Sequence, residues 1–155
     1  MSGASTAEGT AVQQWTRNGG THQRFRFVDS GDGYYRLKAQ HSGKVLDVHG
    51  WFDADLADIV QWDDTSGSNQ QFRLEDSANG WVRLVNRTSG KGVEVQDSAT
   101  AGGPEAVQFT DRDGADQQWR PVPVKSVSEQ VHTAGRVRDL GEKLQFSWPG
   151  VYFEG

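Results

Sequence analysis

Three copies of one sequence pattern, spaced 47 residues apart, constrain the fold of this chain more than any other feature. Each copy ends with a glutamine that is followed two positions later by a large aromatic residue. The landmarks that recur in register are Trp15, Trp62 and Phe109; Gln23, Gln70 and Gln117; Phe25, Phe72 and Trp119; Gly43-Lys44 and Gly90-Lys91; and Asp47-Val48 and Glu94-Val95. Self-similarity at a fixed period is the signature of repeat architectures, so we expect three equivalent units, named copies one to three in chain order.

Each copy indicates short strands separated by turns. Copy two predicts four strands, at residues 34–39, 44–48, 58–62 and 70–74, and Gly, Ser, Asn or Asp residues bound them. Copy three repeats this layout between residues 81 and 120. No segment shows the apolar spacing of an amphipathic helix, so the prediction is an all-β fold.

Copy one is truncated relative to the other two. Met1 stands 47 positions before Val48, so the first strand of copy one and nearly all of its second are missing. About ten of twelve strands are therefore expected, and because one copy cannot bury its own apolar face, the three copies should share a common core.

The composition narrows the class of partner. Hydrophobic residues make up 34% of the 155 residues and aromatic residues 10%, which suits a small all-β core. A net charge of −5 argues against nucleic acid or an anionic membrane as the main partner. The chain has no cysteine, which excludes disulfides and thiolate metal sites. We expect no metal and no cofactor.

The repeated Gln-x-Trp and Gln-x-Phe motifs resemble those of the ricin-B-type lectins and of the carbohydrate-binding modules attached to bacterial glycan-degrading enzymes. The resemblance covers residues 1–122 and implies a β-trefoil with pseudo-threefold symmetry and a truncated first repeat. Residues 123–134 are predicted to be a linker. Residues 135–155 form a short C-terminal strand segment with two interpretations: it resembles the opening of a carbohydrate-esterase β-sandwich, or it folds back to replace the missing strands of the trefoil.

The resemblance implies a shallow sugar site in each copy, formed by an Asp, a stacking aromatic, an Asn and the motif Gln. Such a site combines a flat apolar platform with oriented polar groups. Copy two has the complete set, which is Asp47, Trp62, Asn69 and Gln70. The alternative for these residues is purely structural, with Trp62 in the core and Asp47 in a turn.

Copies three and one depart from the family pattern. Copy three has Glu94, Phe109 and Asp116 in place of Asp, Trp and Asn, and it keeps Gln117, so a weaker second site is expected. Two carboxylates in one pocket repel each other unless a cation or protonation intervenes. Copy one keeps Trp15 and Gln23, but His22 replaces Asn and the Asp position falls before Met1, so no site is expected there.

Copy two also carries an aromatic pair that the other copies lack. Trp51 and Phe52 lie four and five positions after Asp47, in an otherwise polar loop. Trp51 could extend the stacking platform to a second sugar unit, or the pair could cover a gap in the core. The nearby acids Asp53, Asp55 and Asp58 do not fit the spacing of a calcium loop, so a solvated acidic loop is expected.

The sequence shows no nucleophile elbow and nothing that supports catalysis. The function implied by the resemblance is non-catalytic carbohydrate binding, with an attached secreted enzyme targeted to xylan or to galactose- or arabinose-containing glycans. Two alternatives stay open: a fragment of a carbohydrate esterase, and a trefoil that binds protein rather than sugar. The expected partner is a carbohydrate, the expected location is extracellular as part of a longer precursor, and a homodimer formed by strand exchange is a further possibility.

Overall fold

The computed structural model describes residues 1–13, 21–96, 105–120, 122–123 and 145–147, and the statements below refer to these residues. The fold is all-β, as predicted, and its helices are single 3-10 turns. The strands are β1 (Arg24–Asp29), β2 (Tyr34–Ala39), β3 (Val45–Val48), β4 (Ile59–Trp62), β5 (Phe72–Asp76), β6 (Val82–Asn86), β7 (Gly92–Val95), β8 (Ala106–Phe109), β9 (Val122–Pro123) and β10 (Gln145–Ser147). The 3-10 turns are η1 (Ser2–Ala4), η2 (Thr21–Gln23), η3 (His49–Trp51), η4 (Ser68–Gln70), η5 (Ala78–Gly80) and η7 (Ala115–Gln117).

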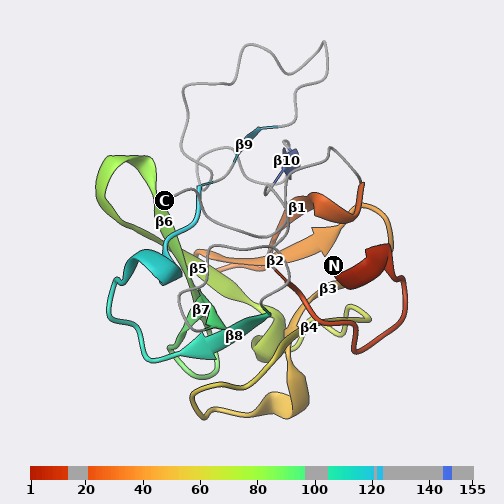
Figure 1. Cartoon of the computed structure of the whole chain (residues 1–155), viewed down its shortest axis with the longest axis horizontal. Helices are drawn as coiled ribbons and strands as arrows, with labels where there is room; N and C mark the ends of the chain where they lie inside the picture. The colour runs from red at the N-terminus through yellow and green to blue at the C-terminus, as the bar shows by residue number, and fades with distance from the viewer. Residues whose placement is uncertain (14–20, 97–104, 121, 124–144, 148–155) are drawn as a thin grey trace.

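The strands of copies two and three repeat one arrangement of antiparallel ladders. In copy two, β2 pairs with β5 and β3 pairs with β4. In copy three, Val82 of β6 pairs with Trp119, and β7 pairs with β8. Neighbouring copies join through β1 with β2 and through β5 with β6, and Figure 1 shows these strands crossing the middle of the molecule.

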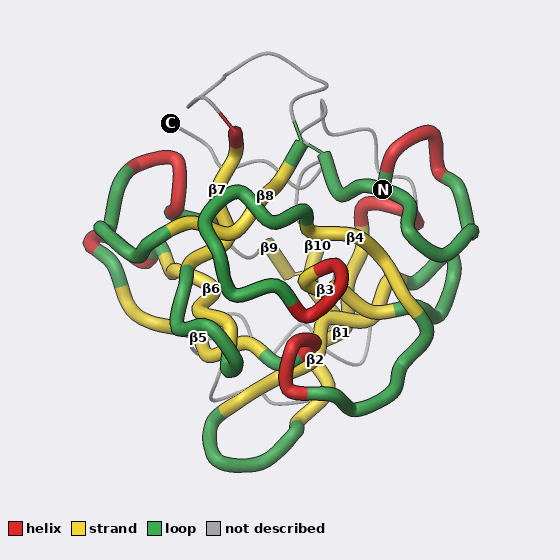
Figure 2. Tube along the Cα trace, turned by 90° about the horizontal axis from the view of Figure 1, so that it is seen from below, coloured by secondary structure: helices red, strands yellow, loops and turns green. Residues whose placement is uncertain are grey.

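The fourth strand of copy two begins two residues later than predicted. Gln70 was expected to open the fourth strand, but it ends the 3-10 turn η4, and β5 begins at Phe72. The third strand of copy one is represented by two isolated bridges, Ala11 with Val60 and Gln13 with Glu105. Figure 2 shows how short strands and long loops alternate around the molecule.

The C-terminal strand β10 lies between β1 and β9, above β1 in Figure 1. Its register follows the repeat: Phe146 is opposite Phe25, just as Tyr35 is opposite Phe72 and Val82 is opposite Trp119. The ladder therefore places β10 where the first strand of copy one is missing. This pairing favours the interpretation in which the C-terminal segment folds back. The domain boundaries stay predictions, because residues 124–144 and 148–155 lie outside the described part of the chain.

The core follows the same period of 47 residues. The aromatic residues of the Gln-x-aromatic motifs, Phe25, Phe72 and Trp119, are all buried in the core that the copies share. Met1 is buried with Val48 and Val95, the residues to which the repeat assigns it. Further buried sets at equivalent positions are Val12, Ile59 and Ala106; Leu37 and Leu84; Leu46 and Val93; and Phe27 and Leu74. Burial of a large apolar side chain contributes about 1.5–3 kcal/mol, so these sets account for why the copies need one another.

Candidate functional site

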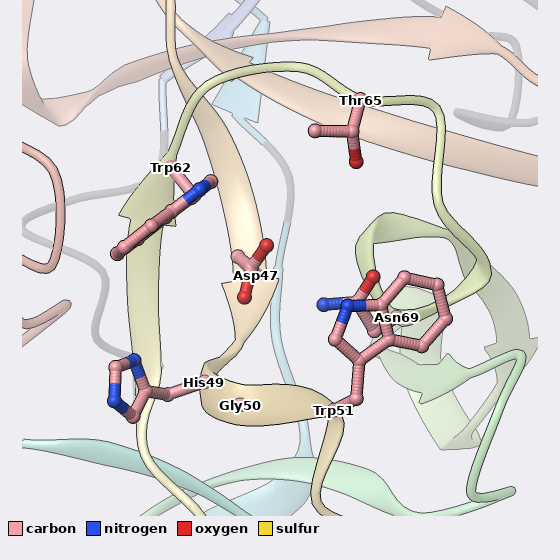
Figure 3. Close-up of a pocket in the computed structure, with 7 residues that line it drawn as sticks. All are labelled: Asp47, His49, Gly50, Trp51, Trp62, Thr65 and Asn69. Atoms are coloured by element: carbon pink, nitrogen blue, oxygen red, sulfur yellow. The ribbon is translucent and has the colours of Figure 1, made fainter.

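A pocket of about 220 Å³ opens on the surface of copy two. Its lining residues come from the end of β3, the turn η3, the end of β4, the loop that leads into η4, and η4 itself. They are Asp47, His49, Gly50, Trp51, Trp62, Thr65 and Asn69 (Figure 3). Sequence analysis named four of them, which are Asp47, Trp51, Trp62 and Asn69, and the structure brings these four together.

Asp47 forms the polar floor of this pocket. The residue is buried in β3, and Figure 3 shows its carboxylate between the rings of Trp62 and Trp51. Burial raises the pKa of Asp47 above the ordinary value of 3.8, although hydrogen bonds from Gln70 and Asn69 and the nearby His49 lower it in part. Within the described residues, Asp47 forms no ion pair, and its Oδ2 accepts a hydrogen bond from Nε2 of Gln70 at 2.8 Å. The remaining acceptor positions of the carboxylate can receive hydrogen bonds from hydroxyl donors.

Trp62 and Trp51 stand on opposite sides of the Asp47 carboxylate. Trp62, at the end of β4, is half-buried, and a Cβ added to Gly9 would lie 3.8 Å from its ring. His49 packs edge-on to Trp62, with 6.2 Å between the ring centroids. Trp62 is therefore a wall of the pocket rather than a residue of the buried core.

Trp51 lies on the surface and keeps 55% of its area exposed. Phe52 beside it is 59% exposed, so this aromatic pair does not cover a gap in the core. The Trp51 backbone has a φ of 62°, a left-handed conformation that is unusual for a bulky residue. Ala4, its equivalent in copy one, has a φ of 55°, so the conformation belongs to the repeat and the tryptophan is the addition.

The Trp51 ring packs directly on the turn before η4. A Cβ added to Gly67 would lie 2.8 Å from the Trp51 ring and 2.7 Å from Oδ1 of Asn69. Gly67 has a φ of −68°, so glycine is needed here for the close approach and not for the backbone angle. The turn and Trp51 thus form one wall.

Gln70 lies beneath the pocket and does not line it. Its side chain is fully buried, and Nε2 donates to Oδ2 of Asp47 and to the carbonyl of Asp63, both at 2.8 Å. Its Oε1 accepts a hydrogen bond from the Thr65 backbone N–H at 3.0 Å. Gln70 therefore orients the carboxylate and fixes the loop that carries Thr65.

Asn69 contributes one satisfied and one unsatisfied group. Its Nδ2 donates to the Val48 carbonyl at 3.2 Å, whereas Oδ1 is buried without a hydrogen-bond partner within the described residues. Buried polar atoms are nearly always paired, so this oxygen, which belongs to a residue that lines the pocket, is an acceptor that a ligand could satisfy.

Copy three places its four predicted residues together, but an arginine occupies the space between them. Arg112 donates to Oε1 of Glu94 and, at 2.7 Å, to Oδ2 of Asp116. Its guanidinium carbon lies 5.1 Å from the centre of the Phe109 ring. The cation that two facing carboxylates require is thus supplied by the chain itself.

Copy one shows no comparable site within the described residues. Trp15 lies outside them, Gln23 is buried, and His22 packs edge-on to His41 at 6.2 Å. No group of three His, Asp or Glu side chains in the described part of the chain is arranged to hold a metal ion. Among the same residues, no helix is long and apolar enough to cross a membrane.

Sequence reasoning missed three residues of the copy two pocket, which are His49, Gly50 and Thr65. Gly50 and His49 belong to η3, and their proximity to Asp47 along the chain was the available signal. Thr65 could have been found by its equivalence to Arg112, because the two residues stand 47 positions apart and differ sharply in size and charge.

Comparisons with known proteins agree with the fold. The family model described as "Ricin-type beta-trefoil lectin domain-like" matches residues 1–62 and 67–140. A search of curated proteins finds no match to the chain. Among solved structures, a designed threefold-symmetric protein, ThreeFoil, is 44% identical with a TM-score of 0.75, and the match covers 77% of this chain and 85% of that one.

Two natural proteins are also similar. The exo-β-1,3-galactanase 1,3Gal43A from Clostridium thermocellum is 30% identical with a TM-score of 0.73, over 75% of this chain and 25% of the galactanase chain. A lectin from Polyporus squamosus shares the fold alone, at 12% identity and a TM-score of 0.51, over 71% of this chain and 48% of the lectin. The repeat, the shared core and the family match together show that this chain belongs to the ricin-type β-trefoil lectin-like family.

Proposed function

We propose that this chain is a non-catalytic carbohydrate-binding module whose working site is the copy two pocket. The observation that carries the proposal is the placement of two tryptophan rings on opposite sides of a carboxylate that has no cationic partner in the described structure. Carbohydrates present apolar C–H faces and vicinal hydroxyls, and this arrangement offers platforms for the former and acceptors for the latter.

Each pocket residue has a distinct role in the proposal. Trp62 stacks on one face of the sugar ring, and Asp47 accepts hydrogen bonds from two neighbouring hydroxyls. Asn69 adds polar contacts at the end of the pocket near Trp51, and Gln70 acts as a positioning residue that orients Asp47 from below. Trp51 supports the sugar ring on the open side and extends the platform to a second unit.

The size of the pocket limits what enters it. At about 220 Å³ it is smaller than the pockets of roughly 300–1,000 Å³ that hold drug-sized ligands. One sugar ring is therefore held in the pocket, while further units of an oligosaccharide lie across the exposed aromatic pair. Single sites of this kind bind weakly, at about −4 to −5 kcal/mol, which corresponds to millimolar to submillimolar dissociation constants.

The candidate sugars are galactose-, arabinose- and xylose-containing glycans. A similar module stands within an exo-β-1,3-galactanase, which makes β-1,3-linked galactose oligosaccharides the first candidates. In the same proposal the module is secreted and targets an attached glycan-active enzyme to its polysaccharide.

The test is a titration with galactose, xylose and arabinose oligosaccharides, followed by tryptophan fluorescence. We expect saturable quenching by one class of sugar and at least a tenfold loss of affinity in Trp62→Ala, because a tenfold change corresponds to only about 1.4 kcal/mol. Trp81→Ala is the matched control, since Trp81 packs with Arg120 outside this pocket. Quenching that survives in Trp62→Ala with the wild-type affinity, or no quenching of the wild type at tens of millimolar sugar, contradicts the proposal.

A protein-binding role is the second candidate. It is favoured by the exposure of three large apolar side chains on one copy, which are Trp51, Phe52 and Leu56. A wild-type chain that shows no quenching with any of the three sugar classes leaves this candidate as the better explanation of the exposed residues.

A further inference from the structure

Copies two and three share the same hydrogen-bonded frame beneath their sites. Gln117 Nε2 donates to Oε1 of Glu94 at 3.2 Å and to the Thr110 carbonyl at 2.9 Å, as Gln70 donates to Asp47 and Asp63. The backbone N–H of Arg112 donates to Oε1 of Gln117 at 3.0 Å, the same length as the equivalent bond of Thr65. The backbone of copy three is therefore prepared for a site like that of copy two.

The two copies differ in what occupies the space above this frame. In copy two, Thr65 carries a short side chain and the pocket is open. In copy three, the equivalent Arg112 contacts all three groups that correspond to the pocket walls: the carboxylate Glu94, the aromatic Phe109 and the turn residue Asp116. The guanidinium thus makes the contacts that a ligand would make.

We propose that Arg112 is a built-in occupant that closes the copy three site, and that the choice of threonine or arginine at this position decides which copies bind. This inference rests on the proposed sugar-binding function of copy two. A neutral sugar that displaced Arg112 would replace two charge-assisted hydrogen bonds with hydroxyl hydrogen bonds. It could not compensate for the two carboxylates left without their cation.

The charges around Arg112 explain why it stays in place. Glu94 and Asp116 are each about 5% exposed, so both acids need a partner on the inside of the site. The hydrogen bond to Glu94 and the charges of both acids raise the already high pKa of Arg112 further, so the guanidinium remains charged. Removal of Arg112 alone would leave two facing carboxylates, so it is not by itself a useful variant.

The experiment opens copy three by giving it the copy two residues. The opened variant carries Glu94→Asp, Phe109→Trp, Arg112→Thr and Asp116→Asn, and a matched control carries the same changes except Arg112→Thr. Isothermal titration, at a chain concentration close to the dissociation constant, with the oligosaccharide that quenches the wild-type protein most strongly gives the number of sites per chain. We expect one site in the wild type, one in the control and two in the opened variant.

Three results would overturn the inference. The first is an opened variant that keeps the wild-type circular dichroism spectrum but still binds one sugar. The second is a control that binds two. The third is sugar binding by the unmodified copy three. Asp47→Ala and Trp62→Ala together remove the copy two site. If sugar binding remains in that variant, and the further change Phe109→Ala abolishes it, Arg112 does not close the copy three site. A wild-type chain that binds no sugar is a separate outcome, because it removes the proposed function itself.

Discussion

At the scale of single residues, the two carboxylates at equivalent positions have opposite settings. Asp47 has no cation bound to it in the described structure, and burial raises its pKa above the usual value for an aspartate. Burial also raises the pKa of Glu94. Arg112 binds this carboxylate and so lowers the Glu94 pKa in part. An available carboxylate and a neutralised one therefore occupy the same place in two copies of one unit.

Sugar binding by Asp47 should depend on pH. The ionised carboxylate accepts hydroxyl hydrogen bonds, and because its pKa is raised, it becomes protonated at a higher pH than an ordinary aspartate would. Affinity should hold near neutral pH and fall as the pH decreases towards the raised pKa, so the decline begins at a higher pH than it would for an ordinary aspartate. Dissociation constants measured by fluorescence between pH 7 and pH 4 give this profile.

Asp47→Asn provides the control for this pH profile. The amide cannot ionise, so we expect at least tenfold weaker binding at neutral pH, in line with the roughly 1.5–3 kcal/mol assigned to hydrogen bonds with charged groups. Its affinity should be nearly independent of pH over the same range. A wild-type profile that stays flat down to pH 4 argues against a role for the ionised carboxylate. The same raised pKa makes Asp47 contribute to folding stability at low pH, and this contribution is lost as pH rises through its folded pKa.

At the scale of elements, the turns before η4 and η7 form a natural pair of test sites. Gly67 and Gly114 are equivalent, and neither turn tolerates a Cβ easily. A Cβ on Gly67 meets Asn69 and the Trp51 ring, whereas a Cβ on Gly114 meets Asp116 at 2.7 Å and Arg112 at 3.3 Å. The same strain can thus be introduced into the open site or into the occupied one.

Gly67→Ala should displace Trp51 and weaken sugar binding by about tenfold, a change of roughly 1.4 kcal/mol. Gly114→Ala should leave binding unchanged. Both variants should lose a similar amount of stability, about 1–3 kcal/mol for overpacking, as measured by urea unfolding. Equal affinities in the two variants would show that the Trp51 wall does not contribute to the site.

At the scale of the whole molecule, the sheet depends on a strand from the far end of the chain. β10 pairs with both β1 and β9, and without it these strands present unpaired edges. Removal of residues 124–155 should therefore lower the melting temperature by at least about 5 °C, since 1 kcal/mol corresponds to roughly 2–8 °C in small domains. The exposed edges should also promote association, which sedimentation velocity detects as a dimer.

A chain shortened only by residues 148–155 keeps β10 and serves as the control for this truncation. We expect it to keep the oligomeric state of the full chain and to melt close to the temperature of the full chain. If the longer truncation melts at the same temperature as the control, β10 is not part of the trefoil, and the domain boundary near residue 122 gains support.

The repeat made the fold predictable because each landmark recurs in three environments that must be equivalent. Phe25, Phe72 and Trp119 stand at equivalent positions and are all buried, and Met1 is buried like Val48 and Val95, its equivalents. Gln70 was harder, because a glutamine can face a ligand or a neighbouring carboxylate, and only the structure shows that it turns inward. Arg112 was missed for a related reason: charge repulsion implied a cation near Glu94 and Asp116, but no local pattern said which side chain would supply it.

The pairing of β10 also has a consequence for the order of folding. Residues 24–26 meet residues 145–147, so this contact spans most of the chain, and contacts of high sequence separation slow folding. Copies two and three can pair their strands as they emerge during synthesis, while β1 waits for its second neighbour until residue 147 has been made. The pairing of β1 with β10 is thus the last to form. Copy two, which carries the pocket, is assembled before it.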